Sequence, residues 1–275
     1  MNIVQHFETL RQMGIRRYAK KETPEILIGL QENQFSREEL VKILCTRYQA
    51  AHFFVGMLEH MLQSIDRGTY RDKDRLDPSL IPIFRSVVAD NLSEELGLKK
   101  GYGGPHSEGR KNLLEALGVD YDAWAAPLGT YDVPGPGVHE GVGYILHQVK
   151  GVIACGAVEA LTVLWYYENR ITLDYPLLLH AFEYRFPTLR RTDGRYAERD
   201  PLWHLASHAE HDSGHARTAV YALARLQGLP GMWHESIENG VHETWKGVEN
   251  FWNLLSEKFG GKFISRGVWE TRVSP

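Results

Sequence analysis

GVIACGAVEALTVLWYY, residues 151–167, is the most apolar stretch of the chain and decides its fold class. It contains one charged residue, Glu159, and Lys150 stands directly before it. The stretch is 17 residues long, whereas a helix that crosses a membrane needs about 20 apolar residues. We therefore interpret it as part of a long buried helix, from about Val138 to Glu168, in a globular protein.

Helical periodicity extends outward from this stretch in both directions. Apolar residues recur at three- and four-residue spacing, and no segment shows sustained apolar–polar alternation between hairpin signals. The pattern predicts an all-α protein, a bundle of seven or eight helices that forms a single domain over residues 1–275. Helical patterns cover residues 4–20, 24–30, 37–65, 78–96, 106–117, 138–168, 177–185, 201–226 and 235–259.

Local signals mark several of the expected helix ends. Ser36 and Glu39 have the spacing of a capping box, which is typical of a helix N-terminus. Asp77 precedes Pro78 in the N-cap and N1 arrangement. Gly97 is expected to end the helix that begins there.

Composition excludes several classes of protein. The chain has 275 residues, of which 43% are hydrophobic and 24% charged, as in ordinary globular proteins. The formal net charge of -4, with basic residues scattered along the chain, argues against partners such as nucleic acid or an anionic membrane. Two cysteines, Cys45 and Cys155, are too few for a disulfide framework, and no signal peptide follows Met1. A cytoplasmic location is the expectation.

The histidines are unevenly distributed, and four of them fall within residues 204–215. At about 100° per residue, His208, Asp212 and His215 lie at about 0°, 40° and -20° around a helix, on one narrow stripe. His204 and His211 flank that stripe. Imidazole and carboxylate ligands suit iron, manganese or zinc, although the same spacing also occurs on solvated helix faces.

A second group of candidate ligands lies in NLSEELG, residues 91–97, and just after it. Glu94 and Glu95 end one expected helix, and His106 begins the next after a glycine-rich connection. A helix end followed by a turn can bring Glu95 and His106 together. Adjacent glutamates at a helix end can equally be solvated surface groups.

A third carboxylate is expected from the apolar helix, which offers Glu159 and Glu168. A charge on a buried helix needs a cation or a proton, because an isolated buried charge is very costly. The two glutamates face opposite sides of the helix, so only one can reach a shared metal ion. Burial favours Glu159, because Glu168 is followed by Asn169 and Arg170 and could lie at a surface end.

These motifs together resemble the haem-oxygenase-like di-iron oxidases and oxygenases, a family related in fold to the TenA thiaminases and pyrroloquinoline quinone synthase. The resemblance rests on NLSEELG at 91–97, on His106 with the leucine-rich segment ending ALGVD at 116–120, and on HAEHDSGH at 208–215. It spans roughly residues 20–225. The implied fold is a single haem-oxygenase-like helical domain.

The resemblance implies a set of iron ligands and a reaction class. The family positions correspond here to Glu95, His106, Glu168, His208, Asp212 and His215. Glu168 is preferred to Glu159 because the family places this glutamate near the C-terminal end of its helix. The implied cofactor is Fe(II), two ions per chain, which react with dioxygen through a peroxo-di-iron(III) intermediate. The implied substrate is a small carboxylate-bearing molecule such as an amino acid or a fatty acid.

Two other functions stay open at this point. A metal-free enzyme of the same fold would use acid–base residues, as the TenA and quinone-synthase relatives do, and a carrier would bind haem or another ligand through one histidine. Arg190, Arg191 and Arg195 could contact a substrate carboxylate, although solvated loop charges are the commoner role. The tryptophan-bearing segment 235–259 could support a homodimer or pack on its own domain.

Overall fold

The structure is a computed structural model that describes residues 25–67, 77–99, 103–226 and 232–259. In these ranges all the regular elements are helices, and the one β-bridge joins Gly129 to Pro134. The predicted all-α fold class is therefore confirmed. The helix predicted over residues 4–20 lies outside the described residues.

The described residues form ten α-helices and two short 3-10 helices, more than the seven or eight helices predicted. The 3-10 helices are η1 (Pro78–Leu80) and η2 (Ala126–Leu128). The α-helices are α2 (Glu25–Gln31), α3 (Arg37–His52), α4 (Phe54–Arg67), α5 (Ile81–Glu95), α6 (His106–Ala116), α7 (Tyr121–Ala125), α8 (Glu140–Ile153), α9 (Ala157–Arg185), α10 (Trp203–Ala224) and α11 (Met232–Lys258).

Part of the excess comes from a break in the helix predicted over residues 37–65. The structure divides it into α3 and α4 at Phe53. Phe53 and Phe54 are both buried in the core, so burial of two consecutive aromatic rings overrides the local helical periodicity. The short helix α7, which Asp120 caps through the Ala123 backbone N–H, had no counterpart in the prediction.

The helix boundaries around the apolar stretch 151–167 also differ from the prediction. The predicted helix over 138–168 is interrupted after Ile153, and residues 154–156 separate α8 from α9. In turn α9 continues through Pro176 and absorbs the separate helix predicted over 177–185. A proline inside a helix removes one backbone hydrogen bond. Burial of the adjacent Tyr175 and Leu178 side chains offsets that loss.

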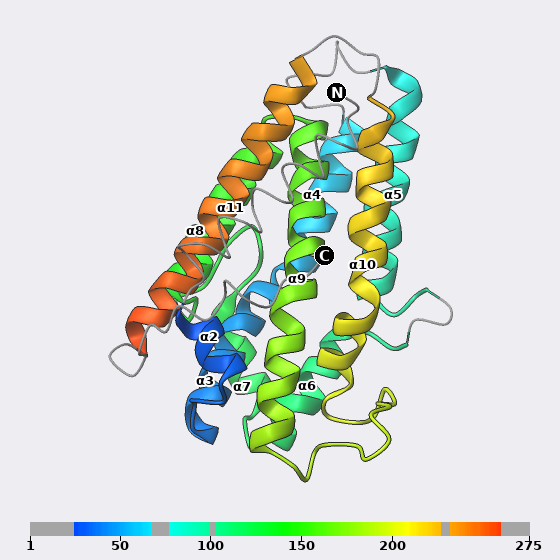
Figure 1. Cartoon of the computed structure of the whole chain (residues 1–275). Helices are drawn as coiled ribbons and strands as arrows, with labels where there is room; N and C mark the ends of the chain where they lie inside the picture. The colour runs from blue at the N-terminus through cyan, green and yellow to red at the C-terminus, as the bar shows by residue number, and fades with distance from the viewer. Residues whose placement is uncertain (1–24, 68–76, 100–102, 227–231, 260–275) are drawn as a thin grey trace, which may run out of the picture.

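The long helix α9 runs along the middle of the molecule, and α10 lies beside it (Figure 1). On the other side of α9, α11 packs along α8. The helices α4 and α5 pack against each other at the end of the bundle opposite α6 and α7. Consequently α9 contacts neighbours on several sides, and its side chains can reach α5 and α10.

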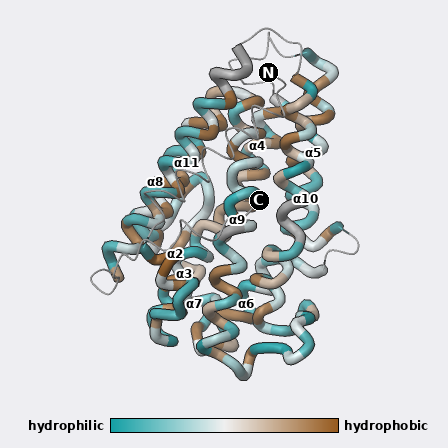
Figure 2. The backbone as a smooth tube through the Cα atoms, viewed as in Figure 1, coloured by the Kyte–Doolittle hydropathy of each residue, from teal (hydrophilic) through white to brown (hydrophobic). Residues whose placement is uncertain are grey.

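The core follows α9 and the inner faces of the helices around it. Hydrophobic and hydrophilic residues alternate along each long helix (Figure 2), as expected for amphipathic helices that pack on a core. Trp252, Phe251 and Leu255 of α11 are fully buried in this core. The aromatic face of α11 thus packs on its own chain, and the homodimer stays a prediction.

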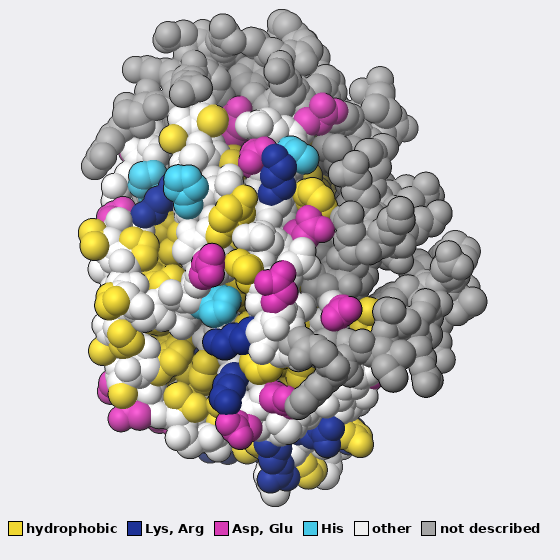
Figure 3. All heavy atoms as spheres, turned by 90° about the vertical axis from the view of Figure 1, so that its left-hand side faces the viewer, with side chains coloured by type: hydrophobic (Ala, Val, Ile, Leu, Met, Phe, Trp, Pro, Cys, Tyr) yellow, Lys and Arg dark blue, Asp and Glu magenta, His cyan; other side chains and the backbone are white. Residues whose placement is uncertain are grey.

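The surface carries charges of both signs. Acidic and basic side chains are interspersed with apolar ones over the face that lies to the left in Figure 1 (Figure 3). Among the described residues, we find no helix with the length and apolar character needed to cross a membrane.

Candidate metal centre

A tight connection between α5 and α6 brings two candidate ligands together. Gly97 ends α5 with a φ of 68°, in the left-handed region that favours glycine. A Cβ atom at Gly97 would lie 2.4 Å from the backbone nitrogen of Pro105. Because the chain approaches itself so closely here, Glu95 at the end of α5 faces His106 at the start of α6.

The first group of candidate ligands consists of Glu95, His106 and His208. His106 Nδ1 lies 2.9 Å from Oε1 of Glu95, and both side chains are buried. The His208 ring, from α10, lies with its centroid 4.6 Å from that of His106. Arg110 adds a positive charge, with Nη1 3.7 Å from Oε2 of Glu95. Three helices therefore contribute to one buried cluster.

His204, one turn before His208 on α10, belongs to the same cluster. It is fully buried, and one ligand nitrogen of each of His106, His204 and His208 lies within 4.8 Å of the other two. His204 Nδ1 lies 3.0 Å from the hydroxyl oxygen of Tyr48 on α3. Among the described residues, these three histidines form the group best placed to hold one metal ion.

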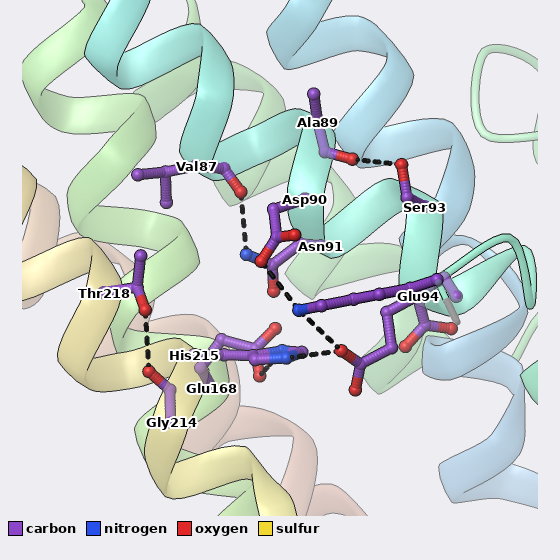
Figure 4. A network of polar contacts seen from close by, with 12 residues as sticks. Val87, Ala89, Asp90, Asn91, Ser93, Glu94, Glu168, Gly214, His215 and Thr218 are labelled. Atoms are coloured by element: carbon purple, nitrogen blue, oxygen red, sulfur yellow. Dashed lines mark hydrogen bonds and ion pairs between the residues drawn. The ribbon is translucent and has the colours of Figure 1, made fainter. Parts of the chain in front are cut away.

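The second group joins α5, α9 and α10 (Figure 4). His215 Nε2 lies 2.8 Å from Oε2 of Glu94, and His215 Nδ1 lies 3.5 Å from Oε2 of Glu168. Lys99 Nζ lies 3.3 Å from the same Glu94 oxygen and 2.8 Å from Oδ2 of Asp90. The imidazole of His215 thus lies between two buried carboxylates.

Burial keeps the imidazoles of His204 and His208 neutral. Burial, together with the positive charge of His106, lowers the pKa of His208 to about 3. Burial and the charge of His208 also hold the pKa of His204 well below its usual range. Burial alone would raise the pKa of Glu95, but His106 and Arg110 outweigh it and lower that pKa to about 2. Neutral imidazole and ionised carboxylate are the forms that bind metal ions.

The second group holds a proton instead. Burial alone would lower the pKa of His215, but the carboxylates of Glu168 and Glu94 outweigh it and raise that pKa to about 11. Despite its own burial, Glu94 has a lowered pKa because it contacts His215 and Lys99. In the metal-free protein the His215 imidazolium therefore offsets part of the negative charge of the two carboxylates.

The structure brings five of the six expected ligands into these two adjacent groups. Glu95, His106 and His208 lie in the first group, and Glu168 and His215 in the second. The groups are close enough for the charge of Glu168 to raise the pKa of His208. Asp212 belongs to α10, but its side chain lies outside the described residues.

Of the two candidate glutamates on α9, Glu168 is the one that lies at the cluster. Glu159 precedes it by about 13.5 Å along the helix axis. The Glu159 Cα is 3.5 Å from the position of a Cβ atom at Gly240 of α11. Glu159 therefore borders α11, whereas Glu168 contacts His215 of α10.

Two members of the groups were absent from the expected ligand set. His204 was predicted only to flank the stripe, although its spacing of one turn from His208 indicates a shared face. Glu94 precedes a predicted ligand in sequence, and a helix normally points adjacent side chains about 100° apart. His204 joins the first group because α6 packs closely against that turn of α10. Glu94 and Glu95 point in different directions from α5, so each of them contacts a different group.

A small cavity of about 20 Å³ opens beside the first group. Glu95 and His208 form part of its wall. The other lining residues are Arg47, Ala50, Ala51, Phe54, Arg110, Tyr167, Ile171 and Tyr175. The sequence also suggested that loop arginines could contact a substrate carboxylate. These residues, Arg190, Arg191 and Arg195, are exposed on the loop before α10. The positive charge next to these candidate ligands thus comes from buried arginines of α3 and α6.

Known proteins with this architecture are found by structure, since neither a family model nor a curated protein matches the sequence. Two crystal structures of a CADD-like protein of unknown function from Nostoc punctiforme are similar. One aligns with a TM-score of 0.64 and 13% identity, over 92% of this chain and 98% of that chain. The other aligns with a TM-score of 0.61 and 14% identity, over 92% and 96% of the respective chains. At this identity the likeness establishes a shared helical fold.

Proposed function

We propose that this protein is a non-haem di-iron oxidase or oxygenase that uses dioxygen to oxidise a small carboxylate-bearing substrate, such as an amino acid or a fatty acid. One observation carries the proposal. Glu95, His106 and His208 converge in the core from three helices, next to a second group that contains Glu168 and His215. Buried carboxylates and imidazoles in this number are the donor set of di-iron proteins.

The donor set fits two divalent cations. Glu95, His106 and His208 would hold one ion, and Glu168 and His215 the other, with Asp212 on the same helix face one turn before His215. Replacement of the His215 proton by a cation keeps the charge of the surrounding carboxylates compensated. Bound ferrous ions would supply the electrons and the open coordination positions for the reaction with dioxygen.

Glu94 has a supporting role in this arrangement. Because His215 Nδ1 faces Glu168, its Nε2–H donates to Glu94. A carboxylate on the outer nitrogen of a ligand histidine fixes the ring orientation and raises its basicity. Glu94 is therefore assigned as a positioning residue for His215.

The positive charge around the cavity favours a substrate that carries a carboxylate. Arg47 and Arg110 line it, and each is buried. Their closest carboxylate contacts, 3.9 Å to Asp174 and 3.7 Å to Glu95, exceed hydrogen-bond distance. The guanidinium groups thus have donors to offer an incoming carboxylate. Phe54 and Ile171 form an apolar wall that excludes water from the same space.

The decisive experiment loads the full chain with Fe(II) without oxygen and then mixes it with dioxygen and a panel of amino and fatty acids. We expect two bound irons per chain and dioxygen consumption that depends on one class of substrate. Glu168→Gln should lose one of the two irons and the activity. Glu159→Gln should retain two irons and the activity.

The other candidate functions give different results in that experiment. A chain that retains no iron, yet transforms a substrate, would be a metal-free enzyme of this fold. A Soret band on addition of haem, without binding of iron ions, would indicate a carrier. Either result would contradict the di-iron proposal.

A further inference from the structure

We propose that His204 is a metal ligand, which completes a three-histidine position together with His106 and His208. The proposal rests on the proposed metal centre and deepens it. The ligand set expected from the sequence has two histidines at this position and places His204 beside them. The structure indicates an imidazole-rich site next to a carboxylate-rich one.

The geometry of the three rings carries the first step. Their ligand nitrogens lie within 4.8 Å of one another. Nitrogens that share one ion at about 2.1 Å are at most about 4.2 Å apart. Small rotations of buried side chains are therefore enough to close the site. The ring centroids of His204 and His208 are 4.6 Å apart, the same separation as for His106 and His208.

The hydrogen bonding of His204 carries the second step. Its Nδ1 is bonded to the hydroxyl of Tyr48, whereas its Nε2 is buried without a hydrogen-bond partner among the described residues. A buried polar atom without a partner is costly to the folded state. A cation between the three rings would satisfy Nε2, with Nδ1–H donating to the Tyr48 oxygen. Ligand histidines in proteins commonly have such an outer partner.

The helix packing around His204 carries the third step. Gly109 of α6 faces α10, and a Cβ atom there would lie 2.9 Å from the Cβ of His204. The missing side chain lets α6, which begins with His106, approach α10 at the turn that carries His204. Two helices are thus held together at the point where their histidines face each other.

The consequence is a difference between the two metal positions. The first offers three imidazoles and the Glu95 carboxylate, and the second offers carboxylates around the single imidazole of His215. Imidazoles suit Zn²⁺ and Co²⁺, whereas carboxylates favour harder ions such as Mn²⁺. We therefore expect the first equivalent of Zn²⁺ or Co²⁺ to enter the three-histidine position.

The test titrates the metal-free full-length chain with Co²⁺ and follows both affinity and visible absorption. His204→Ala should weaken binding of the first ion at least tenfold and change its spectrum. His147→Ala, which removes an exposed histidine of α8, should change neither. If His204→Ala binds the first Co²⁺ with the affinity and spectrum of the wild type, His204 is a structural core histidine and the inference is wrong.

A measurement on the wild type avoids the risk that a core variant fails to fold. X-ray absorption of the chain loaded with one equivalent of Zn²⁺ should show three imidazoles at the metal. Two imidazoles would overturn the inference and leave the di-iron proposal intact. A wild-type chain that binds neither Zn²⁺, Co²⁺ nor Fe(II) would refute both proposals together.

Discussion

His215 Nε2 lies 2.8 Å from Oε2 of Glu94, although the two residues are 121 positions apart in the chain. The contact joins α10 to the end of α5, and Glu168 of α9 approaches the other nitrogen of the same ring. One imidazole thus links three helices at the proposed second metal position.

This contact predicts the effect of Glu94→Gln. The substitution keeps the shape of the side chain and removes the charge that fixes His215. We expect affinity for the second metal ion to fall about 10–100-fold, as for other outer partners of ligand histidines. Stepwise metal titration of the purified chain measures the change. Asp90→Asn, at the other carboxylate bound to Lys99, is the matched control and should leave the affinity unchanged.

The raised pKa of His215 predicts how stability of the metal-free protein depends on pH. The pKa rises from 6.5 to about 11 on folding, so between these values the folded state holds a proton that the unfolded state has released. The stabilisation is complete below about pH 6.5 and is lost as the pH rises toward about 11. Melting temperatures measured from pH 6 to pH 10 should fall more steeply for the wild type than for His215→Gln. Parallel curves would contradict the assignment.

Substrate entry can be separated from metal binding at Ala51. This residue lines the cavity beside Glu95 and His208. Ala51→Phe should fill the cavity, abolish substrate-dependent dioxygen consumption and leave two irons bound. Ala116→Phe, at an exposed position of α6, serves as the control. Unchanged activity of Ala51→Phe would place the substrate elsewhere.

Loss of the buried Asp174 carboxylate should greatly lower the stability of the protein. Asp174 is fully buried, 2.8 Å from Arg170 and 3.9 Å from Arg47. Burial raises the pKa of Asp174 even though both arginines oppose the rise. Asp174→Asn removes the negative charge that faces two buried guanidinium groups, and we expect a loss of about 3–5 kcal/mol in free energy of unfolding.

Denaturant unfolding measures this loss, and an exposed pair gives the reference. Asp66→Asn removes a carboxylate that contacts Arg85 at 2.8 Å on the surface. Such exposed pairs contribute about 0–1 kcal/mol. Similar losses in the two variants would show that the Asp174 cluster is better solvated than its burial indicates.

The connection between α5 and α6 predicts a difference between two glycine substitutions. Gly97 and Gly118 both have positive φ, 68° and 81°, but a Cβ atom would collide with Pro105 at Gly97 and meets nothing within 4 Å at Gly118. Both alanine variants incur a conformational cost of about 1–3 kcal/mol. Only Gly97→Ala should also separate Glu95 from His106 and weaken metal binding. Equal metal affinity in the two variants would contradict this account.

The sequence was sufficient for the features that depend on local chemistry. The capping box at Ser36 forms as predicted, with the Glu39 backbone N–H donating to the Ser36 hydroxyl oxygen at 3.2 Å. Asp77 caps the turn that Pro78 begins, and Gly97 ends α5. Hydrophobic periodicity was likewise sufficient to predict the all-α class, because the spacing of apolar residues within each segment defines its amphipathic face.

Helix boundaries inside the core depended on tertiary packing. Phe53 interrupts one predicted helix because two aromatic rings enter the core there, and α9 continues through Pro176 because its neighbours bury the residues around it. Neither choice is visible in a local window of sequence.

The candidate site divides in the same way. Spacing on one helix put His208 and His215 on a common stripe, since both belong to α10. The contacts between residues of different helices depend on how α5, α6, α9 and α10 pack. This packing places Glu168 rather than Glu159 beside His215 Nδ1, and Glu94 beside His215 Nε2. It also places His204 beside His106. A single helix fixes the direction of a side chain, whereas its partner is set by the approach of other helices, which no residue encodes alone.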